Sequence, residues 1–237
     1  MKQPLWQPSA ERVDASAMER FRRRVAASGV PVPDSAALHR WSTEVPADFW
    51  SAAWDDLGML GDKGQRVLEP GEDMAAARFF PGARISIVEN LLDGRGAADD
   101  DAAIEYRRED GESRTLTWAG LRQQVAAFAA ALDAQGVGEG DVVAAWMPHV
   151  PETIVAMLGA ASLGAVFTST SSDFGTAGVV DRFGQVEPAV LVAADAYLYG
   201  GKTFDRTEAL AEIRSSLPSL RSLVVVSPVG PRPIGHI

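Results

Sequence analysis

The sequence predicts an α/β fold, in which a layered parallel sheet follows a mostly helical, Trp-rich N-terminal region. From residue 117 onward, apolar runs of strand length alternate with segments of helical periodicity, a pattern typical of buried parallel strands joined by crossover helices. The first 100 residues lack this alternation and carry Trp41, Trp50 and Trp54. The last apolar run is followed only by SPVGPRPIGHI, so the architecture is expected to be incomplete.

The N-terminal region is predicted to be helical or irregular. Ala17–Ala27 has the pattern of a basic amphipathic helix, Gly58–Gly71 is loop-like, and Ser86–Leu92 is a short helix. Between the basic helix and the loop-like segment, one helical face is apolar and is formed by Phe49, Trp50, Ala53, Trp54 and Leu57. We expect this face to pack on a larger body, with an aromatic ligand cage as the alternative.

A hairpin opens the second half. Ala102–Arg107 and Ser113–Thr117 are strand-like runs around Asp110-Gly111, a favoured tight-turn pair. Thr117 is then a suitable N-cap for a helix. Gly136 is well placed to end that helix in the left-handed conformation.

Four strands and three helices then alternate. The predicted strands are Val142–Met147, Ala165–Thr168, Ala189–Ala193 and Leu223–Val226, and the predicted helices are Glu152–Ser162, Thr176–Gln185 and Arg206–Leu217. Pro151 suits a first helical position, where its missing N–H costs nothing, and Gly164 stops the helix that it begins. We therefore expect a leader over 1–100, the first part of an α/β domain over 101–227, and a Pro/Gly-rich tail over 228–237.

Composition excludes or disfavours several classes of function. The chain has no cysteine, which excludes disulfides and thiolate zinc sites, and its three histidines lie far apart, which disfavours other zinc sites. The net charge of −10 disfavours a nucleic-acid or anionic-membrane surface. No apolar run is long enough to span a bilayer, and the N-terminus lacks a signal-peptide core, so a soluble cytoplasmic protein is predicted.

Two motifs resemble phosphate-handling sites without meeting their requirements. Asp173-Phe174-Gly175 matches the magnesium-binding tripeptide of kinases, but the glycine-rich loop, strand lysine and catalytic loop of a kinase are missing. AYLYGGKT, from Ala196 to Thr203, differs from the NTPase phosphate loop at its first glycine and has bulky residues where the loop must wrap a phosphate. Lys202 and Arg206 could still pair with a phosphate, or could be solvated loop cations.

Other motifs favour structural interpretations. GVGEGD, over 136–141, precedes a strand rather than following one, which argues against a dinucleotide loop. His149 is a lone histidine, and the serines of 169–172 have no evident base, so nucleophilic serine chemistry is not supported.

Position along the predicted sheet indicates where a ligand would bind. In parallel sheets, ligands bind at the carboxyl ends of the strands. Three loops, Met147–Pro151, Thr168–Gly175 and Asp195–Asp205, leave such ends. Their hydroxyls and glycines, together with Lys202, could contact an anionic or nucleotide-bearing ligand.

Five segments resemble the N-terminal part of acyl-CoA synthetases of the adenylate-forming, AMP-binding superfamily. They are DFWSAAWD (48–55), ARFFPGARISIVENLL (77–92), LTWAGLRQQVAAFAAAL (116–132), MPHVPETIVAMLGAASLGAVFTSTSSDFG (147–175) and YGGKTFDR (199–206). Within that family, STSSDFG together with YGGKTFDR favours the branch that activates acetoacetate.

The resemblance implies a two-step reaction. Acetoacetate and Mg-ATP give an acyl-adenylate and pyrophosphate, and the CoA thiol then displaces AMP. It also implies a set of CoA neighbours, namely Ser172, Asp173, Phe174, Gly175, Lys202 and Arg206. No catalytic or metal-binding residue is assigned to this chain, and the oligomeric state is left open.

The family's ATP-phosphate loop, acyl pocket and catalytic lysine have no counterpart in these 237 residues, so we expect the chain alone to lack ligase activity and to bind CoA at most. Three alternatives stay open. The chain is a non-catalytic CoA- or nucleotide-binding module, it is a fragment of an acetyl- or propionyl-CoA synthetase, or it folds poorly because its sheet has an exposed edge.

Overall fold

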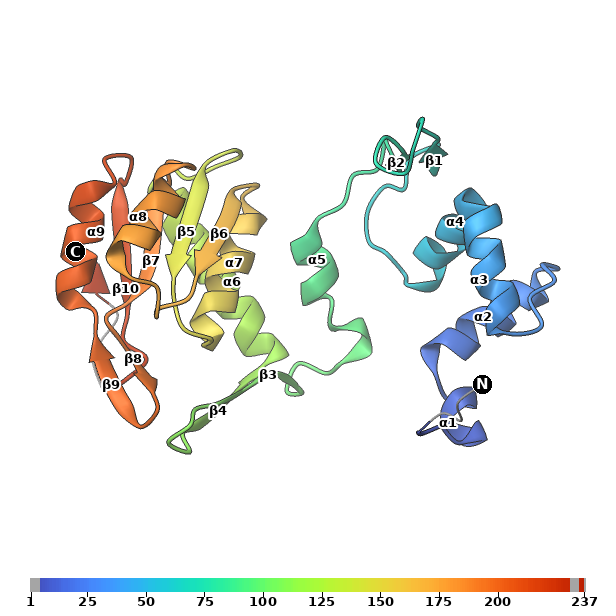
Figure 1. Ribbon diagram of the computed structural model, residues 1–237, viewed down its shortest axis with the longest axis horizontal. Coiled ribbons are helices and arrows are strands. Elements are labelled where there is room, and N and C mark those ends of the chain that lie inside the picture. Colours follow the sequence, from blue (N-terminus) through green and yellow to red (C-terminus); the bar gives the residue numbers. More distant parts are fainter. Residues whose placement is uncertain (1–4, 231–234, 237) are drawn as a thin grey trace. The chain divides into compact units, whose positions relative to one another are not determined.

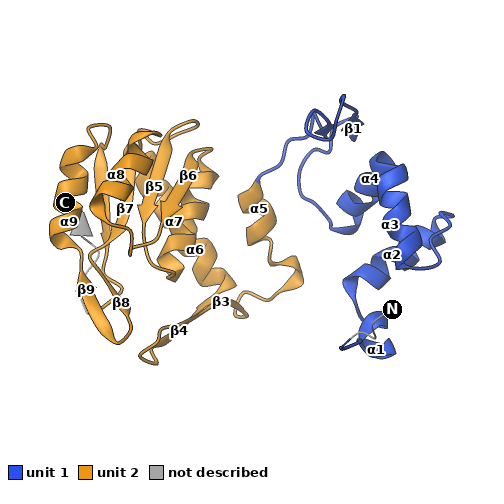
Figure 2. Cartoon of the chain, viewed as in Figure 1, with its two compact units in different colours: residues 1–86 blue, residues 87–237 orange. Residues whose placement is uncertain are grey.

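The computed structural model of the chain describes residues 5–230 and 235–236. It divides into two compact units, Met1–Ser86 and Ile87–Ile237 (Figure 2). Each unit has a hydrophobic core of its own. The domain boundary expected after residue 100 stays a prediction. None of the described helices is long and apolar enough to cross a membrane.

The first unit is a group of helices followed by a small two-stranded sheet. Its elements are α1 (Ala10–Asp14), α2 (Ala17–Ala27), α3 (Ser35–Glu44), α4 (Pro46–Asp56), β1 (Leu68–Glu69) and β2 (Arg78–Phe79). Hydroxyl and carboxylate side chains begin three of the helices. Ser9, Ser16 and Asp34 each accept a hydrogen bond from a backbone N–H in the first turn. The predicted basic helix over 17–27 is confirmed.

The predicted apolar face of α4 packs only in part. Phe49 joins a core cluster that includes Val25 and Leu38, and its ring meets that of Trp41 edge to face at 5.7 Å. Trp50 is 43% exposed, and Leu57 lies beyond the end of the helix and is 60% exposed. The helix ends one residue before Leu57, so that residue does not extend the helical face.

The second unit is a layered α/β structure around one sheet (Figure 1). Its helices are α5 (Ile87–Leu92), the 3-10 turn η1 (Gly94–Gly96), α6 (Trp118–Asp133), α7 (Pro151–Ser162), α8 (Thr176–Gly184) and α9 (Thr207–Ser216). Its strands are β3 (Ala102–Arg107), β4 (Ser113–Thr117), β5 (Val142–Trp146), β6 (Val166–Thr170), β7 (Val190–Ala194), β8 (Ala196–Tyr199), β9 (Lys202–Asp205), β10 (Ser222–Val226) and β11 (Gly235–His236). The sheet order is β11-β10-β7-β5-β6, and its neighbours are parallel except for β11 against β10.

Both faces of this sheet are covered by helices, because its central strands are apolar at every position. Val143 and Ala145 of β5 point to a cluster that contains residues of α6 and α7. Their neighbours Ala144 and Trp146 point to a second cluster with residues of α8 and α9. Alternate residues of one strand thus bury on opposite faces, as expected for a parallel sheet between two helical layers.

The predicted elements of this unit are confirmed, with ends that differ by one or two residues. The hairpin strands and the Thr117 cap match the prediction, and Gly136 has a left-handed φ of +74°. One expectation about these strands is wrong. The strand over 165–168 was predicted to be buried, but it lies at the edge of the described sheet, continues to Thr170, and leaves Val166 53% exposed. An edge strand tolerates hydroxyl side chains, which is why part of the hydroxyl run is strand rather than loop.

Candidate functional site

A cavity of about 460 Å³ lies at the carboxyl ends of the parallel strands. Its wall joins segments that are far apart in the sequence. They are Tyr106–Glu109 of the β3–β4 hairpin, Pro148–Val150 after β5, Ser171–Asp173 after β6, Tyr197–Tyr199 of β8, and Pro228 and Val229 after β10. The three loops that the sequence analysis singles out therefore all contribute to one cavity.

Ser172 is the buried polar residue of this wall. Its side chain is 2% exposed, and its hydroxyl oxygen has no hydrogen-bond partner among the described residues. It follows the end of β6 at Thr170 and sits in a turn in which the Phe174 N–H donates to the Ser171 carbonyl at 3.2 Å. A buried hydroxyl normally finds a partner, and because this oxygen is itself shielded, a molecule in the cavity reaches it only after the side chain rotates.

The other residues of this loop have different surroundings. Asp173 lines the cavity, whereas Phe174 and Gly175 are not part of its wall. Phe174 is 37% exposed, and the Arg182 guanidinium lies over its ring at 4.7 Å from the centroid. Gly175 is the N-cap residue of α8, with a φ of −71° that any residue can adopt.

The segment Asp195–Asp205 is not the loop that the sequence predicts. Apart from Asp195 it forms an antiparallel hairpin, in which β8 pairs with β9 from Ala196–Asp205 to Tyr199–Lys202. Gly200 and Gly201 make its two-residue turn, with φ angles of +59° and +73°. Alternating Tyr197, Tyr199 and Phe204 favour a strand pairing over a phosphate-wrapping loop, and the resemblance to an NTPase loop is therefore local in sequence only.

Lys202 and Arg206 lie in different environments. Lys202 is exposed at the start of β9, directly after the diglycine turn. Arg206 is half-buried, and its guanidinium lies 4.9 Å from the ring centroid of Tyr197 and 5.5 Å from that of Trp146. Neither side chain is part of the cavity wall, but Tyr197 is. Arg206 therefore acts on the wall through the aromatic ring that it covers.

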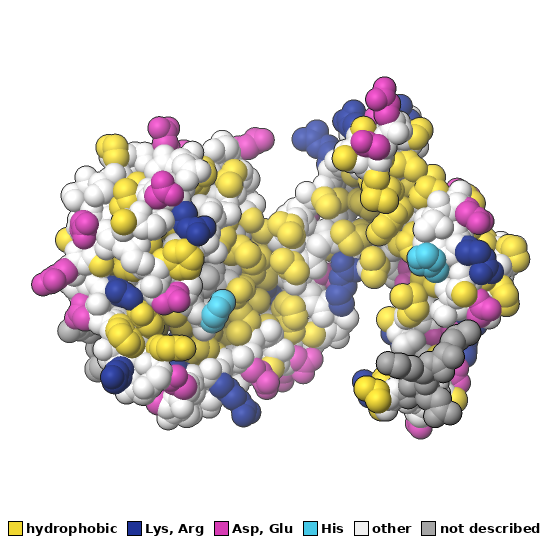
Figure 3. Space-filling view, in the orientation of Figure 1, with side chains coloured by type: hydrophobic (Ala, Val, Ile, Leu, Met, Phe, Trp, Pro, Cys, Tyr) yellow, Lys and Arg dark blue, Asp and Glu magenta, His cyan; other side chains and the backbone are white. Residues whose placement is uncertain are grey.

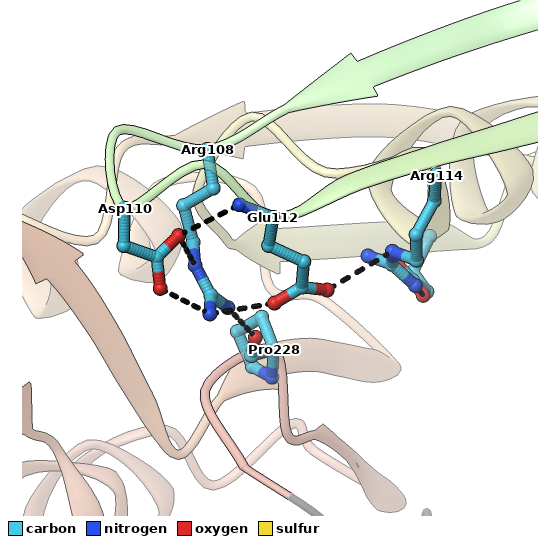
Figure 4. A network of polar contacts seen from close by, with 6 residues as sticks. Arg108, Asp110, Glu112, Arg114 and Pro228 are labelled. Carbon is cyan, nitrogen blue, oxygen red and sulfur yellow. Dashed lines mark hydrogen bonds and ion pairs between the residues drawn. The ribbon is translucent and has the colours of Figure 1, made fainter.

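The β3–β4 hairpin is the part of the wall that sequence reasoning missed. Its Asp-Gly turn predicts a hairpin, but no local signal places that hairpin against the end of the sheet. Arg108 holds it there, pairing with Asp110 and Glu112 and donating to the carbonyl oxygen of Pro228 (Figure 4). Arg114 of β4 adds an ion pair of 2.7 Å with Glu152 at the start of α7.

These contacts determine the protonation behaviour of the hairpin. The hydrogen bonds from Arg108 lower the pKa of Asp110 from 3.8 to about 2, against a smaller opposing effect of burial. The same pair raises the pKa of Arg108, and the Glu152 contact raises that of Arg114. Both guanidinium groups therefore stay charged at any physiological pH.

The cavity wall carries charges of both signs. Arg107, Arg108, Glu109 and Asp173 all line the cavity, together with His149. On the face drawn in Figure 3, Lys and Arg side chains of the second unit are scattered among Asp and Glu. Within residues 5–230 and 235–236, no three His, Cys, Asp or Glu side chains gather in a group that could hold a metal ion.

Comparisons with known proteins identify the family and the relatives that this chain resembles. Residues 94–233 match the family of AMP-binding enzymes. The chain is 42% identical to the acetoacetyl-coenzyme A synthetase of Rhizobium meliloti (strain 1021) over 235 residues, which are 96% of this chain and 34% of that protein. It is 37% identical to the acetoacetyl-CoA synthetase of Macaca fascicularis, over 97% of this chain and 34% of that protein.

A solved structure shows the same fold. The acetoacetyl-CoA synthetase from Streptomyces lividans superimposes with a TM-score of 0.91 at 41% sequence identity, over 98% of this chain and 36% of that one. The chain thus spans about a third of the length of the relatives it matches.

Proposed function

The chain belongs to the family of AMP-binding enzymes, and from that premise we propose that it forms the CoA side of an acid–CoA ligase that activates acetoacetate with ATP. In the first step a carboxylate oxygen attacks the α-phosphorus of ATP, and pyrophosphate leaves. In the second step the CoA sulfur attacks the carbonyl carbon of the acyl-adenylate, and AMP leaves. Magnesium enters with ATP, and the setting is the cytoplasm.

The buried hydroxyl of Ser172 is the observation that carries the proposal. It is an unsatisfied polar atom in the wall of a cavity whose volume of about 460 Å³ is in the range of ligand sites. A hydrogen bond from CoA would satisfy it, and Asp173 would contact the ligand from the same wall. Phe174 and Gly175 shape the loop from outside the cavity and set the start of α8.

Lys202 and Arg206 have separate roles in this proposal. Lys202 is an exposed ammonium directly after the glycine turn, where its side chain can pair with a CoA phosphate. Arg206 supports Tyr197, whose ring lines the cavity. A charge-assisted contact with phosphate therefore belongs to Lys202, and support of the wall belongs to Arg206.

The isolated chain is proposed to bind CoA without catalysing the full reaction. The chain aligns with about a third of the length of its relatives, so residues in the other two thirds cannot contribute to catalysis by the isolated chain. Pyrophosphate release by the purified 237-residue chain with acetoacetate and ATP would contradict this part of the proposal.

Calorimetric titration of the chain with CoA tests the site. We expect binding that weakens about fivefold in Lys202→Ala, the loss of one exposed charge contact, with a larger effect at low salt. Ser172→Ala should also weaken binding. Arg214→Ala is the matched control, because it removes an exposed cation of α9 that is not in the cavity wall, and it should leave the affinity unchanged. A chain that does not bind CoA, or whose affinity Lys202→Ala and Arg214→Ala reduce equally, would overturn the assignment.

A further inference from the structure

Two hairpins that are about 90 residues apart in the sequence are joined by one carboxylate. The backbone N–H of Gly201 donates to Glu109 Oε1 at 2.7 Å, and that of Gly200 donates to Glu109 Oε2 at 3.1 Å. Figure 1 shows the β3–β4 and β8–β9 hairpins at the same end of the second unit. We call this pair of hydrogen bonds the Glu109 clasp.

The diglycine turn is built to hold an anion. Both of its residues have positive φ, +59° and +73°, the conformation of a two-residue turn that matches the twist of a hairpin. Its two consecutive N–H groups are not used in the pairing of β8 with β9, which runs only from Ala196–Asp205 to Tyr199–Lys202. Consecutive N–H groups in such a turn form a concave site for an anion, which Glu109 fills from its own chain.

Glu109 is held in place by its neighbours. Arg108 and Asp110, which flank it, form a two-pronged ion pair with hydrogen bonds of 2.9 and 2.7 Å. The backbone N–H of Arg108 donates to the backbone carbonyl of Glu112 at 2.8 Å, which closes the loop. The Arg108 guanidinium also donates to the carbonyl oxygen of Pro228 (Figure 4). Because its neighbours are fixed in this way, little backbone freedom is left to lose when Glu109 meets the turn.

Glu109 belongs to the wall of the cavity, and Gly200 and Gly201 directly follow the wall residues of the other hairpin. Glu109 lines it from one hairpin, and Tyr197–Tyr199 line it from the other. The two hydrogen bonds of the clasp link one hairpin directly to the other. Glu109 therefore helps to fix the position of β8 in the wall and of Lys202 directly after the turn.

We propose that Glu109 is a positioning residue of the CoA site, and that its clasp fixes the β8–β9 hairpin so that Tyr197 and Lys202 are ordered before CoA arrives. The identity of the ligand in this inference rests on the proposed function. The clasp itself does not, because it is present in the structure without a ligand. In this proposal the effect of Glu109 on CoA binding passes through the glycine turn that it holds.

Nuclear magnetic resonance of the ¹⁵N-labelled chain tests the clasp without ligand. In Glu109→Gln the side chain keeps its length but loses its charge, and in Glu109→Ala both hydrogen bonds are lost. We expect the amide proton signals of Gly200 and Gly201 to move upfield, more in Glu109→Ala than in Glu109→Gln. Their hydrogen exchange should quicken in the same order. Glu105→Gln is the control, because Glu105 is an exposed glutamate of β3, the strand that leads to the turn of Glu109, and the change should leave both signals in place.

Titration with CoA then tests the positioning role. We expect Glu109→Ala to weaken binding roughly threefold to tenfold, the effect of losing a net hydrogen bond, with Glu109→Gln in between. Unchanged Gly200 and Gly201 signals would overturn the clasp. Altered signals with unchanged or tighter CoA binding would overturn the positioning role, and tighter binding would identify Glu109 as a competitor of the ligand. Failure of the unmodified chain to bind CoA would refute the proposed function, while the amide signals would still report on the clasp.

Discussion

The guanidinium of Arg206 lies over the ring of Tyr197 and donates a hydrogen bond of 2.8 Å to its hydroxyl oxygen. Tyr197 also stacks on Phe204 at 5.1 Å with an interplanar angle of 14°. The ring that lines the cavity therefore contacts both a cation and an aromatic side chain, and the latter belongs to the other strand of its hairpin.

This arrangement predicts that Arg206 and Tyr197 act as one unit in CoA binding. Arg206→Lys removes the guanidinium N–H that donates to the hydroxyl and Tyr197→Phe removes the hydroxyl that accepts, and each should weaken binding about threefold, as expected for one hydrogen bond. The double variant should bind CoA no less tightly than the single variant with the lower affinity, because both changes break the same hydrogen bond. Calorimetric titration of the three variants measures the coupling. Additive losses would instead show that Arg206 contacts the ligand by itself.

The layered fold could be predicted because each local signal agrees with the next. Short, continuous apolar runs such as Val190–Ala194 are typical of buried strands, and Thr117, Pro151 and Gly136 mark helix ends by their own chemistry. Ligands of parallel sheets bind at the carboxyl ends of the strands, which indicated the loop of Ser172, and in the structure this loop lines the cavity.

The rest of the site depends on contacts that are distant in sequence. Nothing in the residues around Glu109 indicates a partner in a glycine turn about 90 positions later. The hairpin over 196–205 was expected to be a loop, because the pattern AYLYGGKT is shared by a phosphate loop and by two strands around a tight turn. Only pairing distinguishes them, and pairing is not a local property.

A second prediction concerns the pH dependence of the Arg108–Asp110 pair. The folded chain holds the pKa of Asp110 at about 2, below its ordinary 3.8, so as the pH falls the unfolded chain takes up the proton first. The pair therefore stabilises the fold above about pH 4, and this contribution is lost as the pH falls toward 2. The carboxyl ¹³C signal of Asp110 should titrate with a midpoint near 2.

Arg108→Gln provides the control for this titration. Without the guanidinium, the midpoint of Asp110 should move back toward 3.8, and the acid-induced loss of stability in urea unfolding should shrink. A midpoint near 3.8 in the unmodified chain would show that the ion pair does not form in solution.

A third prediction concerns the packing of α6 against α7, the helices that cover one face of the sheet. Gly159 lies in α7 where a Cβ atom would come within 2.7 Å of the Phe128 ring and 3.3 Å of the Ala129 backbone nitrogen. Alanine improves helix propensity by about 1 kcal/mol, but here the helices must separate or Phe128 must leave its rotamer. We expect Gly159→Ala to lower the free energy of unfolding by about 1–2 kcal/mol, measured by urea titration.

Gly178→Ala is the matched comparison, because it makes the same change in α8, where the nearest atom to the new Cβ is 3.7 Å away. Without a clash, only the propensity gain remains, and the free energy of unfolding should rise by about 0.5–1 kcal/mol. Opposite signs for the two variants would show that close helix contact, rather than backbone freedom, requires glycine at 159. Stabilisation by both would mean that α6 and α7 are less tightly packed than these distances indicate.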